Sequence, residues 1–184
     1  MSLLDGFVAA TPTLAHTFHT TVKNFGERPA QMFKVEGVFQ SLSYRQFAQI
    51  VEEMATGLIA LGIKPGDNVC LMARTAADWG WADFSILTSG GVTVCVYPTL
   101  TAEELIFIAN HSTARYIVAG DAEVLKRVVA ALPEIKTVEK VIVLQAGAGA
   151  GNEQVIDIDE LRELGRNFAA NHPGAYEERW QSLT

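Results

Sequence analysis

Four short runs of apolar residues recur along the sequence, and stretches with helical periodicity separate them. None of the four shows the strict alternation of polar and apolar residues that marks a strand with one face in water. Strands that are apolar throughout are buried on both faces, and helical crossovers join parallel strands. The pattern therefore predicts the α/β class, with one parallel sheet covered by helices on both faces. The runs are 69–73, 92–96, 116–119 and 138–144.

Apolar periodicity and capping residues place the helices. One apolar stripe runs from 44 to 61, Ser43 and Gln46 form a capping box at its start, and Gly62 ends it. The segment 13–25 has the same spacing. The other expected helices are one that is capped by Thr75 and runs to about Thr88, one over 102–110, one behind the cap Asp121, and one over 158–164 behind an Asp157/Glu160 cap.

A small hairpin is expected ahead of the long helix. The runs 31–35 and 38–42 are rich in β-forming residues, and Glu36-Gly37 between them suits a tight turn. We predict a short antiparallel pair that is separate from the parallel sheet.

The composition excludes several classes of protein. The chain has 184 residues, 49% of them hydrophobic and 19% charged, with a formal net charge of −7. It is too apolar for a disordered chain, and it lacks the excess of basic residues that is typical of a nucleic-acid binder. No apolar run reaches the ~18 residues of a membrane span, and no cation precedes Lys23, so no signal peptide is indicated. We expect a cytoplasmic protein with no nucleic-acid partner and no membrane span.

The two cysteines are too few for a disulfide scaffold or a four-thiolate zinc site. Cys70 and Cys95 both lie within apolar runs. We therefore predict that both are buried, unreactive thiols.

Two glycine-containing segments match phosphate-binding loops only in part. Residues 146–152 follow a strand, but Asn152 stands where a G-x-G-x-x-G loop needs its third glycine, and no helix begins there. Residues 88–93 lack a partnering lysine, since no Lys or Arg occurs between Arg74 and Arg115. We interpret the first as a mobile surface loop and the second as a tight turn from helix to strand.

The sequence also shows no complete group of catalytic or metal-binding side chains. His16 and His19 are three residues apart and could meet a metal ion, but no third ligand is near them in sequence. The adjacent acidic pairs at 52–53, 103–104 and 177–178 diverge on a helix, and we interpret them as solvated faces. We expect no metal site and no catalytic residue.

Three stretches, in this order, resemble the N-terminal region of one enzyme family. They are LSYRQF at 42–47 with KPGD at 64–67, ADFSIL at 82–87 running into GVTVCVYPTL at 91–100, and TAEEL at 101–105. Together they resemble the AMP-forming acyl-CoA synthetases of the adenylate-forming superfamily. The run YPTLTAEE is similar to the bacterial long-chain fatty acid–CoA ligase branch. Cys95 stands where many relatives carry proline, and residues 74–79 replace a more usual turn, but neither departure alters the expected fold.

The resemblance implies what the intact protein does. Such ligases use ATP and Mg²⁺ to convert a fatty acid into an acyl-adenylate and pyrophosphate, and CoA then displaces AMP. The family's phosphate-gripping loop, Mg²⁺-holding acids and catalytic lysine have no counterpart here. We therefore expect residues 1–184 to be one truncated, inactive N-terminal subdomain that binds no cofactor alone. Its expected parts are a helix and hairpin (13–42), an alternating α/β core (43–144), and a glycine-rich loop with C-terminal helices (145–184).

The resemblance also implies partners. The expected partners are the remaining subdomains of the same chain, the fatty acid substrate and, through apolar surface left uncovered, a second copy of the fragment. Two alternatives stay open. The chain could be a free-standing α/β binding or interaction module, or a fragment of a medium-chain, aryl or amino-acid-activating relative.

One short segment is a candidate binding site. Ligands of open α/β sheets collect beyond the carboxyl ends of the strands, which here carry Arg74-Thr75, Gly120-Asp121 and the turn at 97–99. The resemblance implies that the nucleotide end of CoA lies near that turn, which consists of Tyr97, Pro98 and Thr99. The alternative is that these residues only shape the turn.

Overall fold

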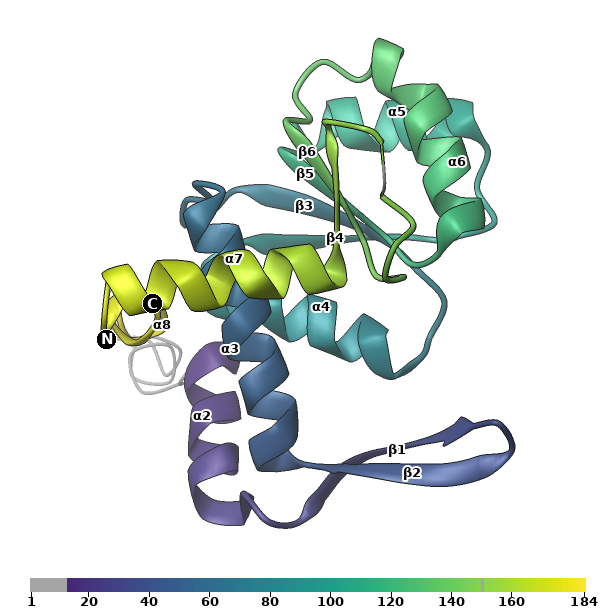
Figure 1. Ribbon diagram of the computed structural model, residues 1–184. Helices are drawn as coiled ribbons and strands as arrows, with labels where there is room; N and C mark the ends of the chain where they lie inside the picture. Colours follow the sequence, from purple (N-terminus) through teal and green to yellow (C-terminus); the bar gives the residue numbers. More distant parts are fainter. Residues whose placement is uncertain (1–12, 150) are drawn as a thin grey trace, which may run out of the picture.

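Five parallel strands form the centre of the molecule, in the order β4-β3-β5-β6-β7 (Figure 1). The computed structural model describes residues 13–149 and 151–184. The strands are β3 (Asn68–Met72), β4 (Val92–Val96), β5 (Tyr116–Ala119), β6 (Lys140–Val143) and β7 (Val155–Asp157). The four predicted strands are confirmed, although β6 is shorter than the run 138–144. The fifth strand, β7, pairs in parallel with β6, for example at Val155 opposite Val141.

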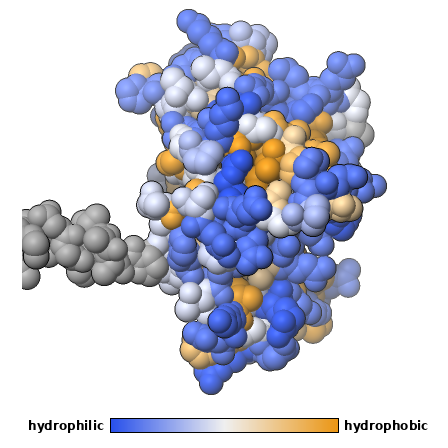
Figure 2. All heavy atoms as spheres, turned by 90° about the vertical axis from the view of Figure 1, so that its left-hand side faces the viewer, coloured by the Kyte–Doolittle hydropathy of each residue, from blue (hydrophilic) through white to orange (hydrophobic). Residues whose placement is uncertain are grey.

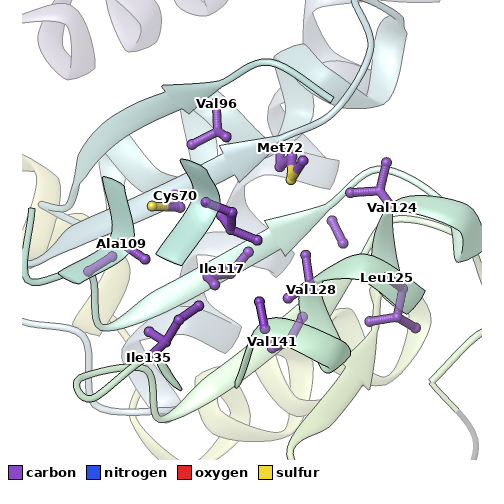
Figure 3. Packing of buried hydrophobic residues seen from close by; sticks show 14 of the residues in the cluster. Cys70, Met72, Val96, Ala109, Ile117, Val124, Leu125, Val128, Ile135 and Val141 are labelled. Carbon is purple, nitrogen blue, oxygen red and sulfur yellow. The ribbon is translucent and has the colours of Figure 1, made fainter. Parts of the chain in front are cut away.

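Each face of the sheet carries its own helices, because successive strand residues point to opposite sides. One face carries α3 (Tyr44–Ala60), α4 (Ala77–Thr88) and α7 (Ile158–Asn171), and the other carries α5 (Ala102–His111) and α6 (Ala122–Ala131), which continues into η1 (Leu132–Glu134). Cys70 and Met72 of β3 pack with residues of α5 and α6 (Figure 3), whereas Val69 and Leu71 pack with residues of α3 and α4. All four side chains are fully buried, which explains why β3 shows no polar alternation.

A hairpin extends away from this body (Figure 1). It consists of β1 (Pro29–Val35) and β2 (Val38–Ser43), which pair only with each other among the described strands. Glu36 and Gly37 form the turn with φ angles of +49° and +82°. The predicted antiparallel hairpin is therefore confirmed.

Two further helices lie beside α3. The helix α2 (Leu14–Phe25) packs Phe18 against Phe47 of α3 and Phe84 of α4, with ring centroids 5.3 and 4.7 Å away. The helix α8 (Ala175–Gln181) contacts both α2 and α3. The side of the molecule shown in Figure 2 is mainly hydrophilic, with separate hydrophobic areas. No helix within 13–149 and 151–184 has the length and apolarity needed to cross a membrane.

The helix expected over 158–164 is longer than predicted, because it continues as α7 to Asn171. Its Asp157/Glu160 capping box is present as expected. Beyond Leu164, the helix is held by tertiary contact: Gly165 is buried against α3, and Arg166 pairs with Glu53. These contacts outweigh the low helical propensity of the glycine.

Two other local predictions are wrong. Thr75 does not cap α4, because that helix begins one residue later than expected, with Ala76 at the cap position and no side-chain cap. Glu53 is not part of a solvated face, because its carboxylate accepts hydrogen bonds from Arg162 and Arg166 at 2.8 and 2.9 Å. Its side chain is only 12% exposed, since α7 packs across it.

The prediction of two buried thiols is correct for Cys70 and wrong for Cys95, which is exposed. The difference follows from strand order. Cys70 lies on β3 between two neighbouring strands, whereas β4 is at the edge of the sheet. An apolar run alone does not show which strand will be the edge.

Candidate ligand site at the ends of β3 and β4

A cavity of about 620 Å³ opens at the carboxyl ends of β3 and β4. The two strands are parallel neighbours, so the segments that follow them emerge at the same edge of the sheet. The structure places Tyr97, Pro98 and Thr99 in the lining of this cavity, together with Arg74 and Thr75. These predicted site residues therefore line one hollow. Its wall is completed by Leu71, Ala73, Trp79, Cys95 and Val96.

The neighbouring exit between β3 and β5 is closed. The strand order reverses at this point, which is where open α/β sheets usually leave a crevice. Here Gly120, directly after β5, packs so tightly on Ala73 that an added Cβ would lie 2.8 Å from the alanine Cβ. Asp121 is also engaged, because its carboxylate accepts the Glu123 and Val124 backbone N–H groups as the cap of α6. The Gly120-Asp121 segment therefore does not line the cavity.

The turn at 97–99 both shapes the backbone and lines the cavity. The backbone N–H of Leu100 donates to the Tyr97 carbonyl at 3.1 Å, which closes the turn. Tyr97 is 77% exposed, so it contributes little to the core. Pro98 is half-buried and Thr99 is exposed at the rim. A large exposed aromatic residue beside a cavity suits contact with a ligand better than packing.

The cavity combines an apolar wall with a cationic rim. Leu71, Ala73 and Trp79 supply the wall, while Arg74 is exposed and forms no ion pair within the described part of the chain. Such a site can hold a flat or apolar group against Trp79 and one phosphate near Arg74.

Burial favours the neutral forms of two titratable groups near the cavity. It raises the pKa of Asp78, although its carboxylate accepts the Trp79 backbone N–H at 2.9 Å. Partial burial, with the nearby charge of Asp83, raises the pKa of the Cys95 thiol. A thiol with a raised pKa is a poor nucleophile.

The two glycine-containing segments have structural roles. In the first, the Gly147 backbone N–H donates to Asp157 Oδ2 at 2.7 Å, so the carboxylate that caps α7 also holds the loop. In the second, Gly90 has a φ of +92°, as a sharp turn from helix to strand requires. Arg179 donates to the Ser89 carbonyl at 2.8 Å, a contact that joins α8 to this turn.

The two histidines of α2, His16 and His19, both contact α8. His19 stacks on Trp180 with ring centroids 4.0 Å apart, and its Nε2 lies 3.1 Å from the Tyr176 hydroxyl. Burial, followed by the proximity of His16, lowers the pKa of His19 to about 4. Burial raises the pKa of Tyr176. The part of the chain that the structure describes contains no group of three His, Cys, Asp or Glu residues that could hold a metal ion.

The family profile and the curated relatives that match this chain agree with each other. The profile of a family described as AMP-binding enzyme matches residues 18–174. The bovine long-chain-fatty-acid–CoA ligase ACSBG1 is 24% identical over 163 residues, which cover 88% of this chain and 22% of that protein. The long-chain-fatty-acid–CoA ligase FadD15 of Mycobacterium tuberculosis is 29% identical over 134 residues, which cover 71% of this chain and 21% of that protein.

Solved structures share the fold. A putative long-chain-fatty-acid CoA ligase from Rhodopseudomonas palustris superposes with a TM-score of 0.69 at 24% identity, covering 83% of this chain and 37% of that one. The A domain of carboxylic acid reductase from Segniliparus rugosus gives 0.73 at 19% identity, covering 84% and 30%. The chain spans about a fifth of the length of the curated relatives that it matches.

Proposed function

Because the chain belongs to the family of AMP-binding enzymes, we propose that it is the scaffold segment of a long-chain fatty acid–CoA ligase. The observation that carries this proposal is the family match over residues 18–174, together with curated relatives that bear that name. The long-chain substrate is part of the proposal, and it follows those relatives.

The proposed reaction has two displacements. A carboxylate oxygen of the fatty acid attacks the α-phosphorus of ATP, and the bond to pyrophosphate breaks. The sulfur of CoA, having lost its proton, then attacks the acyl carbonyl carbon, and AMP leaves. Both steps bring anions together, so they need cations and oriented donors at the reacting atoms.

The described residues contribute binding and support in this scheme. They contain no group of three His, Cys, Asp or Glu side chains that could hold a metal ion, and we assign them no step that involves Mg²⁺. Partial burial raises the pKa of the Cys95 thiol, and the Asp78 carboxylate accepts the Trp79 backbone N–H. We assign the chemical steps to the remaining subdomains of the same protein.

We assign the cavity at β3 and β4 to the nucleotide end of CoA. The apolar wall with Trp79 suits a purine ring, and Arg74 and Thr99 at the rim suit a phosphate. In this arrangement the cavity would position CoA for the second displacement and leave the first unaffected.

The activity is tested in the full-length protein. We expect it to form palmitoyl-CoA from palmitate, ATP and CoA, with lower kcat/KM for medium-chain and aryl acids. A preference for an aryl or amino acid would replace the long-chain assignment. Absence of any ATP-dependent thioester formation would overturn the ligase proposal.

The CoA assignment is tested by placing a negative charge at the rim. Thr99→Glu should repel the phosphate, so we expect a higher KM for CoA and unchanged adenylate formation, measured by pyrophosphate exchange. The matched control is Thr20→Glu, at an exposed position of α2 away from the cavity. Unchanged CoA kinetics in Thr99→Glu would remove this site from the proposal.

A further inference from the structure

The hairpin has two different edges. β1 is anchored to α4, because the side-chain amide of Gln31 donates to the Ala77 carbonyl at 3.2 Å and accepts the Trp81 indole N–H at 2.7 Å. No strand within the described residues pairs with the other edge, that of β2. In Figure 1, β2 lies along the outer border of the hairpin.

The turn geometry identifies the backbone groups on this free edge. Positive φ angles at Glu36 and Gly37 define a two-residue type I′ turn, in which the flanking residues Val35 and Val38 form a hydrogen-bonded pair. Hydrogen bonding alternates along an antiparallel strand. The N–H and C=O groups of Phe39 and Ser41 therefore point outward, away from β1.

The β2 edge lacks the features that prevent an exposed strand edge from pairing with another chain. Proteins protect such edges with lysine, proline or a bulge. β1 has all three, in Lys34, Pro29 and the register shift beside Pro29. The six residues of β2 include no charged residue and no proline.

Apolar side chains accompany the open edge. Met32 and Phe39 share one face of the hairpin and are 66% and 63% exposed. Val38, at the turn, is 62% exposed. A two-stranded hairpin is only marginally stable in water, so additional strands would stabilise it.

The hairpin is a part of this acidic chain where a second copy can approach with little charge repulsion. The chain carries a net charge of −7, so two copies repel each other over most orientations. Residues 29–43 contain one cation, Lys34, and one anion, Glu36, and are therefore neutral. An open strand edge is also self-complementary, because two copies of it pair about a two-fold axis.

We propose that two copies of this chain associate by antiparallel pairing of β2 with β2, which forms a four-stranded sheet. Phe39 of one copy lies opposite Ser41 of the second copy, so that their outward N–H and C=O groups exchange hydrogen bonds. The two-fold axis then passes beside Gln40, which faces Gln40 of the second copy. This inference does not depend on the proposed function.

A cysteine at the axis tests the geometry. In such a non-hydrogen-bonded pair the two Cα atoms lie about 4.5 Å apart, within the range of a disulfide. We expect Gln40→Cys, in a Cys95→Ser background that removes the exposed thiol, to form a disulfide-linked dimer on mild oxidation. The control is Lys34→Cys, which is on β1 and away from the axis. Equal cross-linking of both variants, or none of Gln40→Cys, would overturn the proposed pairing.

Sedimentation tests the interaction without a cross-link. We expect a concentration-dependent dimer whose dissociation constant rises at least roughly tenfold in Ser41→Pro, which removes an outward N–H group. Phe39→Lys is a second variant that leaves the backbone intact, and it should weaken the dimer as well. Circular dichroism checks that both remain folded. A monomer at high concentration, or a dimer that neither substitution weakens, contradicts the inference.

Discussion

Gly165 of α7 lies directly against the backbone carbonyl of Glu53 in α3, with no space for a side chain between the two helices. An added Cβ would collide with that oxygen and would also lie 2.8 Å from the Gly57 nitrogen. Gly57 packs in the same way against the Leu161 carbonyl. The pair of glycines allows α7 to approach α3 at backbone distance and so to cover one face of the sheet.

Replacing Gly165 by alanine should destabilise the protein. Helical propensity alone would favour alanine by up to about 1 kcal/mol. The collision with backbone atoms, which cannot rotate away, should outweigh this and give a net loss of about 1–3 kcal/mol. Urea unfolding followed by circular dichroism measures the change, with Glu163→Ala on the exposed face of α7 as control. A variant as stable as the parent would show that α7 shifts freely on α3.

Glu53→Gln should also be destabilising. The side chain is 12% exposed and pairs with both Arg162 and Arg166, so the neutral glutamine leaves two guanidinium groups without a negative partner. We expect a loss of about 1–3 kcal/mol in the free energy of unfolding. Glu27→Gln breaks the exposed pair with Arg45 and should cost only about 0–1 kcal/mol. Equal effects of the two substitutions would argue against a structural role for the buried pair.

The stability of the α2–α8 contact should fall in acid because of His19. Its pKa is about 4 in the folded protein, whereas an unperturbed histidine, as in the unfolded chain, has a pKa of 6.5. The unfolded chain therefore binds the proton more tightly. The stability that the folded protein gains from neutral His19 is fully present above about pH 6.5. It is lost as the pH falls towards 4.

His19→Phe isolates this contribution, because it keeps an aromatic ring against Trp180 but cannot be protonated. Between neutral pH and pH 4, the melting temperature of the parent should fall more steeply than that of His19→Phe. Thr20→Phe, at an exposed position of the same helix, should retain the slope of the parent. Parallel melting curves for the parent and His19→Phe would exclude His19 as the source.

We expect the 184-residue chain to catalyse neither half-reaction by itself. Loss of one donor at a reacting oxyanion typically costs about 10²–10³ in rate, and the described residues offer no assembled set of such donors. Pyrophosphate release with ATP, Mg²⁺ and palmitate measures the activity, and calorimetry measures ATP binding. Turnover above the buffer blank, or micromolar ATP affinity, would contradict this prediction.

Local signals in the sequence predicted most of the elements. The capping residues Ser43, Asp121 and Asp157 make the expected hydrogen bonds. These signals act within a few residues, so periodicity and capping rules detect them. The capping rule was wrong at Thr75, where the chain stays extended for one more residue.

The features that were not predicted from the sequence depend on contacts between segments that are distant along the chain. β7 has only three residues and exists because it pairs with β6. The exposure of Cys95 depends on strand order, and the length of α7 depends on its contact with α3.

The candidate site was predictable only in part. The rule that ligands gather at strand ends selected the segments 74–75 and 97–99, which line the cavity. It also selected Gly120, which instead closes the neighbouring exit against Ala73. Trp79 was missed as a lining residue, because its place in the wall depends on how α4 leaves β3.

The contact of His19 with Tyr176 joins residues 157 positions apart, and this separation bears on how the protein folds. Closing so long a loop has a large entropic cost, which ordering of the intervening segments reduces. We therefore expect the α2–α8 contact to form after the sheet and to open before it. Trp180 stacks directly on His19, so in a variant with Trp79 and Trp81 replaced by phenylalanine its fluorescence should report this opening before circular dichroism detects loss of the sheet. We thus expect the contact between the two ends of the described fold to form last and to open first.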